Sequence, residues 1–334
     1  MDYQWYPGHM TKARRMMQEN VRLVDLVIEI LDARVPMSSR NPDINQLAQG
    51  KQRLIIMSKA DLADPKMTER FVKQFEKDGA SVIALDARTK KANNQIMKSL
   101  QKITKEKKER DKKRGIIGRP VRAMICGIPN VGKSTFINSL SGRSSAKTGN
   151  KPGVTKGKQW ISFAGLELLD TPGILWPKFE DQQVGVRLAL VGAIRDEILD
   201  EEELARKLLA FMVRTYPELL QARYGMARPK VGGESESSNE FINESSNESR
   251  NESLKESAER STEEFKDELL QAMELAKESG YNDKQLHEIL VIIAARRNLL
   301  RSGGEADPRR AAHLLMDDFR SGRLGAITLD TPEA

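Results

Sequence analysis

The stretch Gly127-Ile-Pro-Asn-Val-Gly-Lys-Ser134 follows an apolar run and precedes a helical pattern. It matches G-x-x-x-x-G-K-[ST], and the strand–loop–helix context raises this motif above chance. Its glycines let the backbone curl, so that successive N–H groups face phosphates at a helix N-terminus. Lys133 would reach the β- and γ-phosphates, and the Ser134 hydroxyl would ligate Mg²⁺. The residues expected to contact the nucleotide here are Asn130, Val131, Gly132, Lys133, Ser134 and Thr135.

Two further segments downstream have the chemistry of a nucleotide switch. Asp170-Thr-Pro-Gly173 follows the apolar run Leu166–Leu169. Asp170 at a strand end can hold Mg²⁺ through water, and the Gly173 N–H can sense the γ-phosphate. The loop residue Thr155 lies between the two motifs and can complete the Mg²⁺ shell only when a γ-phosphate is present. We therefore expect Ser134, Thr155 and Asp170 at the metal, and Lys133 and Thr155 in the catalytic set.

A base-reading element lies upstream of the phosphate loop. The apolar run Arg53–Met57 leads into Ser58-Lys59-Ala60-Asp61. The Asp61 carboxylate can accept hydrogen bonds from N1–H and the amino group of guanine, a donor pair that adenine lacks. Lys59 can cover the ring face. The next apolar run, 81–85, ends at Asp86-Ala87, where the Ala87 N–H could meet the guanine O6.

The order of these motifs is unusual, because an ordinary GTPase begins at its phosphate loop. With the segments Trp5–Met10 and Leu31–Pro36, the chain resembles the circularly permuted GTPases, and among them the ribosome biogenesis GTPase A family. The resemblance covers residues 1–225. It implies a cytoplasmic factor that helps mature the large ribosomal subunit, with a helical C-terminal domain that helps bind it.

One departure from the family pattern lies in the base motif, where Ser58 stands in place of Asn. The side-chain amide that would brace the base and the phosphate loop is lost. Asp61, the main discriminator, is kept. We expect weaker affinity with specificity retained.

Alternation of strand and helix patterns defines the fold class. It predicts an α/β protein with a doubly wound, mostly parallel sheet in which 159–163 and 166–169 form a hairpin. The remaining expected strands cover 24–31, 53–57, 81–85 and 121–126, and the helices 66–78, 92–113 and 133–141.

After about residue 180 the sequence patterns predict helices and no strands. Helices are expected at 188–198, 201–216, 264–278 and 283–301, and the tail should end with a short helix and an extended piece. We expect a permuted GTPase domain at 1–178 and a smaller all-helical domain at 179–334. The Ser/Asn/Glu-rich stretch 231–264 lacks the apolar content to offset its ordering entropy, so it is predicted to be a disordered insertion.

Charge is distributed unevenly along the chain. Residues 1–160 hold 33 of the 55 Lys and Arg but only 15 of the 48 Asp and Glu. This basic half suits a polyanionic partner such as rRNA. The segment from Lys105 to Arg122 is the most basic part. It is either a nucleic-acid-facing surface or a solubilising helix end.

Composition excludes several classes of protein. The single Cys126 rules out an internal disulfide framework and a multi-cysteine zinc site. No apolar run approaches the ~20 residues that a membrane span needs, and the first residues do not resemble a leader. We expect a cytoplasmic monomer that binds GTP and GDP and no membrane.

The position after the Asp-x-x-Gly turn holds Ile174, whose side chain cannot orient the attacking water. Three groups could do so. They are His9, a K⁺ ion near Asn130, and a group from ribosomal RNA. A satisfied surface residue is the alternative reading of His9.

Three functions compete at this point. They are a large-subunit assembly GTPase, a GTPase for tRNA modification or membrane-associated signalling, and an RNA chaperone with weak hydrolysis. A tRNA-modifying enzyme would need an extra catalytic domain, and none is visible. The complete set of phosphate and metal residues argues against the chaperone.

Overall fold

The structure is a computed structural model, and it describes residues 15, 17–86, 89–141, 159–163, 165–171, 181–194, 200–225 and 267–332. The chain divides into two compact units. One comprises residues 1–199 and 326–334, and the other residues 200–325. Each is described by itself.

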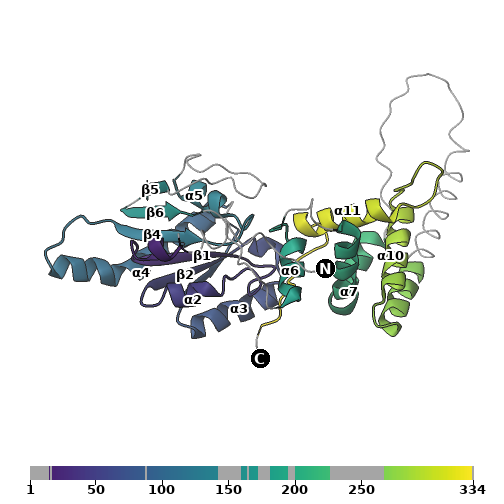
Figure 1. Cartoon of the computed structure of the whole chain (residues 1–334), viewed down its shortest axis with the longest axis horizontal. Coiled ribbons are helices and arrows are strands. Elements are labelled where there is room, and N and C mark those ends of the chain that lie inside the picture. The colour runs from purple at the N-terminus through teal and green to yellow at the C-terminus, as the bar shows by residue number, and fades with distance from the viewer. Residues whose placement is uncertain are drawn as a thin grey trace, which may run out of the picture. The chain divides into compact units, whose positions relative to one another are not determined.

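A six-stranded sheet forms the first unit (Figure 1). The strand order is β3-β2-β1-β4-β6-β5, and only the β5–β6 pair is antiparallel. This confirms the expected mostly parallel, doubly wound sheet and its hairpin. The strands are β1 (Leu26–Asp32), β2 (Gln52–Ser58), β3 (Ser81–Ala84), β4 (Val121–Cys126), β5 (Gln159–Phe163) and β6 (Leu166–Asp170).

Helices connect the strands of this unit. Residues 17–21 are helical, and the helices after β1 are α2 (Asp43–Leu47), the 3₁₀ turn η1 (Ala60–Leu62), α3 (Pro65–Lys77), α4 (Lys90–Lys113), α5 (Lys133–Ser141) and α6 (Gln182–Leu190). Asp64 caps the N-terminus of α3 by accepting hydrogen bonds from the backbone N–H groups of Lys66 and Met67, and Thr89 caps the N-terminus of α4. The five-residue helix at 43–47 was not predicted, since so short a segment carries no helical periodicity.

Strand β1 lies at the centre of the sheet, and all seven of its residues are buried. Leu31 on this strand and Ile55 on β2 share a cluster with Phe71 and Phe75 of α3. Successive strand residues point to opposite faces, so a strand buried throughout is covered on both sides. This packing fixes the carboxyl ends of β1, β2 and β4 at one edge of the sheet, where ligands of doubly wound folds bind.

The division into units differs from the predicted boundary at residue 178. Helix α6 belongs to the sheet-containing unit, and so does the end of the chain from residue 326. Arg187 of α6 donates to Asp330 at 3.1 Å, which joins these two segments. The predicted helix 188–198 overlaps α6 only at 188–190; residues 191–194 are not helical, and 195–198 lie outside the described residues.

The second unit is helical. Its helices are α7 (Glu201–Thr215), α8 (Pro217–Tyr224), a helix at 267–278, α10 (Asp283–Arg296) and α11 (Pro308–Ser321). The fully buried Asp318 accepts from Arg223 at 2.7 Å and from Tyr224 at 2.9 Å, which ties α11 to α8. The predicted insertion 231–264 lies outside the described residues. Within the parts described, no helix is long and apolar enough to cross a membrane.

Candidate nucleotide-binding site

The phosphate loop follows β4 and leads into α5. A side chain is excluded at Gly127, because a Cβ there would lie 2.5 Å from the backbone oxygen of Ile30 in β1. Gly132 adopts φ +97°, which L residues rarely adopt. Helix α5 begins immediately afterwards, at Lys133. The loop therefore has the backbone form of an anion cradle at a helix N-terminus.

Lys133 is buried within this loop. Its ammonium group donates to the carbonyl oxygens of Gly127 at 3.1 Å and Ile128 at 2.7 Å. Ser134 and Thr135 follow in the first turn of α5 and are half-buried. The structure therefore brings the sequence-predicted phosphate residues together at the carboxyl end of β4.

Ser58, at the end of β2, contacts the phosphate loop. Its hydroxyl lies 2.6 Å from the carbonyl oxygen of Val131 and 2.9 Å from that of Leu31. The shorter side chain therefore still reaches the loop and links it to β1, although the amide is absent. The expected weaker affinity for the nucleotide stays a prediction.

Lys59 links the base motif to the phosphate loop more directly. Its ammonium group donates to the carbonyl oxygen of Asn130 and to the Asp32 carboxylate, both at 2.9 Å. The backbone of Lys59 is left-handed, with φ 56°, and the η1 turn follows. Asp61 lies in that turn and is exposed. Two motifs some seventy residues apart in the sequence thus meet at one edge of the sheet.

The second base-supporting element lies beside the first. Leu85, just after β3, donates its N–H to the Met57 oxygen at 3.0 Å, and its own oxygen accepts from Ala60 at 3.4 Å. Asp86 is half-buried and follows directly. Ala87, expected to meet the guanine O6, lies outside the described residues.

Asp32 and Arg34 lie beside Lys59, and no motif in the sequence assigned them a role. Arg34 donates to both carboxylate oxygens of Asp32, at 2.9 and 2.8 Å, and both side chains are buried. Burial alone would raise the pKa of Asp32, but the charges of Arg34 and Lys59 hold that pKa below its ordinary value. Asp32 is therefore a carboxylate that fixes Lys59. The only sequence signal was the Asp-x-Arg spacing after a strand.

Asn130 has a left-handed backbone, with φ 58°. Its side-chain amide donates to the Gly192 oxygen at 2.7 Å, just beyond α6. The phosphate loop is thereby joined to the segment that leaves α6. The K⁺ ion considered near Asn130 stays a prediction.

The chain also offers oxygen donors suited to Mg²⁺. Asp170 ends β6, and in the parallel register it lies opposite Ile125 of β4, one residue before that strand ends. Thr171 next to it is buried and donates its hydroxyl to the Ile125 oxygen at 2.6 Å. This bond fixes the backbone beside Asp170 at the same edge as Ser134. The predicted residues His9, Thr155 and Gly173 lie outside the described residues.

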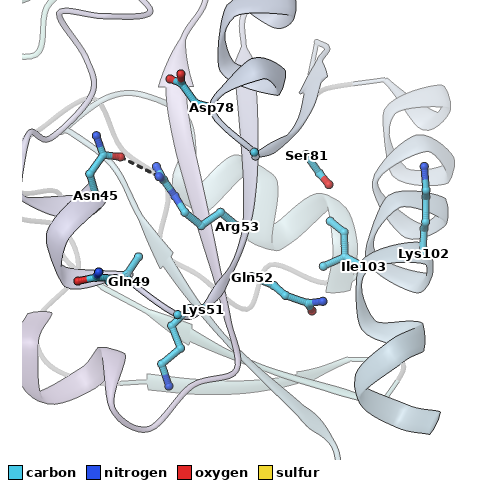
Figure 2. A pocket seen from close by; sticks show the side chains of 12 residues that line it. Asn45, Gln49, Lys51, Gln52, Arg53, Asp78, Ser81, Lys102 and Ile103 are labelled. Atoms are coloured by element: carbon cyan, nitrogen blue, oxygen red, sulfur yellow. Dashed lines mark hydrogen bonds between the residues drawn. The ribbon is translucent and has the colours of Figure 1, made fainter. Parts of the chain in front are cut away.

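A cavity of about 560 Å³ lies elsewhere in this unit (Figure 2). It is lined by Gln52 and Arg53 at the start of β2 and by Ser81 at the start of β3, so it sits at the amino edge of these strands. Arg53 donates to Asn45 across its wall at 2.7 Å. None of the nucleotide motifs lines it.

The sheet and the phosphate loop define a P-loop nucleotide-binding protein, and the predicted base motif after β2 precedes the phosphate loop in the sequence. The family model "50S ribosome-binding GTPase" matches residues 122–229, beginning at β4. The base motif lies upstream of that match. This order is the circular permutation expected from the sequence.

Relatives extend the likeness to the whole chain. Ribosome biogenesis GTPase A of Bacillus pumilus is 48% identical over 335 residues, covering all of both chains. That of Bacillus cereus is 38% identical, over 100% of this chain and 95% of the relative. The chain therefore belongs to the ribosome biogenesis GTPase A family.

Two solved structures share the fold. One is a GDP-bound structure of TM YlqF, with a TM-score of 0.57 and 23% identity over 96% of this chain and 100% of the other. The other is GNP-bound YlqF from T. maritima, with a TM-score of 0.55 and 24% identity over 96% of this chain and 99% of the other. At this identity the likeness concerns the fold alone.

Proposed function

We propose that this chain hydrolyses GTP at the carboxyl edge of its sheet and uses the nucleotide to control its association with the large ribosomal subunit in the cytoplasm. The observation that carries the proposal is the Lys59 ammonium, 2.9 Å from the Asn130 oxygen. It joins the guanine-reading motif to the phosphate loop in one site. Family membership disfavours the alternatives of a tRNA-directed GTPase and of an RNA chaperone.

Recognition of the nucleotide is divided between two groups of residues. Asp61 accepts from the guanine N1–H and amino group, while the stem of Lys59 covers the ring. Asp86 and Ala87 support the base from the loop after β3. The phosphates lie on the backbone N–H groups of the loop that ends at Lys133 and on the positive end of α5.

Mg²⁺ would be held by Ser134, Thr155 and Asp170. Bound there, the ion neutralises charge that develops on the phosphate oxygens. Around it, Lys133 places the β- and γ-phosphates, and the Gly173 N–H senses the γ-phosphate. Loss of that phosphate releases Thr155, which gives the site two states.

Placement of the attacking water is assigned to His9, because Ile174 cannot orient it. Losing this placement should slow kcat with little change in GTP affinity. His9→Ala should bind GTP and the large subunit as wild type does but lose ribosome-stimulated turnover. If ribosomes stimulate that variant as fully as wild type, K⁺ near Asn130 or an RNA group places the attacking water instead.

Helix α4 supplies a face suited to ribosomal RNA. Lys105, Lys108 and Lys112 are exposed and recur at helical spacing on one side of it. Lys107 is different, because it is largely buried and pairs with Asp25 and Asp111 at 3.1 Å. The segment Lys105–Arg122, expected to be either a nucleic-acid-facing surface or a solubilising helix end, thus contains an exposed basic row and an anchored lysine.

Reversal of the exposed row tests this interface. Replacing Lys105, Lys108 and Lys112 by Glu should weaken subunit binding and flatten its salt dependence, since each lost phosphate contact removes roughly 0.7–0.9 from the log–log slope. The matched control is the exposed Glu69→Ala on α3, which should leave the slope unchanged. An unaltered slope in the triple variant would return α4 to a solubilising role.

The test of the whole proposal is sedimentation of the purified protein with large subunits. The experiment is run with GTP, with GDP and with a non-hydrolysable GTP analogue. We expect the subunit-bound fraction to depend on the nucleotide and to be largest with the analogue. Binding that is equal in all three conditions would refute nucleotide control.

A further inference from the structure

The end of the chain packs against the nucleotide-binding unit. Residues Ile327, Thr328, Leu329 and Asp330, which we call the C-terminal strap, are each no more than 2% exposed. The tail was expected to end with a short helix and an extended piece. No motif assigned it to the site.

One half of the strap lies on the base-reading turn. The Ile327 N–H donates to the Leu62 oxygen at 3.0 Å. The Thr328 hydroxyl accepts from the Asp64 N–H at 3.1 Å. Leu62 directly follows Asp61, so these bonds fix the backbone on the C-terminal side of the residue that reads guanine.

The other half of the strap holds the loop after β1. The Leu329 N–H donates to the Arg34 oxygen at 2.7 Å. Asp330 accepts from the backbone N–H of Ser38 at 2.8 Å and from its hydroxyl at 2.6 Å. The side chain of Arg34 in turn holds Asp32, which holds Lys59.

The Asp330 carboxylate also accepts a hydrogen bond from the guanidinium group of Arg187 on α6, at 3.1 Å. Beyond the same helix, the Gly192 oxygen accepts from Asn130 of the phosphate loop. A closed series of contacts therefore runs from the phosphate loop through α6, the strap and the loop after β1, and returns to the phosphate loop through Lys59. The Asp330 side chain contacts both α6 and the loop after β1, and Arg187 of α6 also lies 3.5 Å from the Ser38 hydroxyl of that loop.

We propose that Asp330 is a positioning residue for guanine recognition, which anchors the C-terminal strap across the turn that carries Asp61. The inference rests on the proposed function. Removing the Asp330 carboxylate leaves the buried Ser38 N–H without its acceptor and Arg187 without its counter-ion. The strap then has to move away from its native position. Asp61 and Lys59 then lose their fixed backbone, while the phosphate loop keeps the bonds that Lys133 donates to the Gly127 and Ile128 oxygens.

Base selectivity separates this role from a structural one. The base of IDP, hypoxanthine, lacks the amino group that Asp61 reads in guanine. IDP and GDP carry the same phosphates, so the two nucleotides differ only at the base. Asp330→Ala should therefore reduce the preference for GDP over IDP by about tenfold in the ratio of dissociation constants. The kcat for GTP at saturation should stay near that of wild type. Asp330→Asn keeps an acceptor for the Ser38 N–H and should recover most of the preference.

The experiment measures GDP and IDP dissociation constants by competition with a fluorescent guanine nucleotide, on the full chain. The matched control is Thr331→Ala at the neighbouring exposed position, which should behave as wild type. If Asp330→Ala does not fold, Thr328→Val removes the acceptor for Asp64 at nearly constant volume and should reduce the same ratio. An unchanged ratio in a folded variant, or equal weakening of GDP and IDP, overturns the inference. A wild-type protein without guanine preference would instead overturn the proposed function.

Discussion

Gly127→Ala should disable the phosphate loop, and the structure sets the size of the effect. The new Cβ would lie 2.5 Å from the Ile30 oxygen, whereas ordinary contact begins at 3.4 Å. Ile30 belongs to the central strand and cannot move aside, so the loop must shift by about 0.9 Å. A misplacement of about 1 Å near the reacting groups lowers the rate by about 10²-fold. We expect kcat/KM for GTP to fall by this factor, and the free energy of unfolding by about 1–3 kcal/mol.

The matched control is Gly165→Ala in the β5–β6 turn. This glycine has φ +78°, and its Cβ would meet nothing within 4 Å. It should lose about 1–2 kcal/mol of stability from backbone strain alone and keep wild-type kcat/KM. The assays are phosphate release under subsaturating GTP and urea unfolding. If Gly127→Ala hydrolyses GTP at the wild-type rate, the loop does not hold the phosphates in the way described.

Two further predictions concern the same edge of the sheet. Lys133→Ala and Ser134→Ala should each abolish phosphate release while the circular dichroism spectrum stays native, because these side chains act on phosphate and Mg²⁺; full hydrolysis by a folded variant would refute the P-loop assignment. Burial raises the pKa of the Cys126 thiol well above its ordinary value, so this thiol should not react with Ellman's reagent at pH 8 until urea unfolds the chain. Rapid reaction of the native protein would show that β4 is not buried as described.

Local patterns predicted most of the fold and the phosphate loop. The loop is recognisable because Gly127, Gly132 and Lys133 act within eight consecutive residues between a strand and a helix. Parallel strands also follow from local patterns, since an apolar run between two helices is buried on both faces.

Contacts between distant segments could not be predicted in this way. The bond from Ser58 to Val131 joins residues 73 positions apart, and Asp330 meets Ser38 across 292 positions. Nothing in either local sequence indicates the partner. The domain boundary differed for the same reason, because the tail and α6 carry ordinary composition and are assigned to the sheet by these long-range bonds.

The account depends most on guanine being read by a motif that lies upstream of the phosphate loop. Asp61→Asn tests this directly. The amino group of guanine needs an acceptor at residue 61, and the Asn amide presents a donor instead. Xanthine carries an oxygen in place of that amino group, so it can accept from the Asn amide. The measurement is the ratio of kcat/KM for GTP and XTP in wild type and variant. We expect the variant to shift its preference towards XTP while the wild type prefers GTP. An unchanged preference for GTP in the folded variant would contradict the assignment of Ser58–Asp61 as the base site.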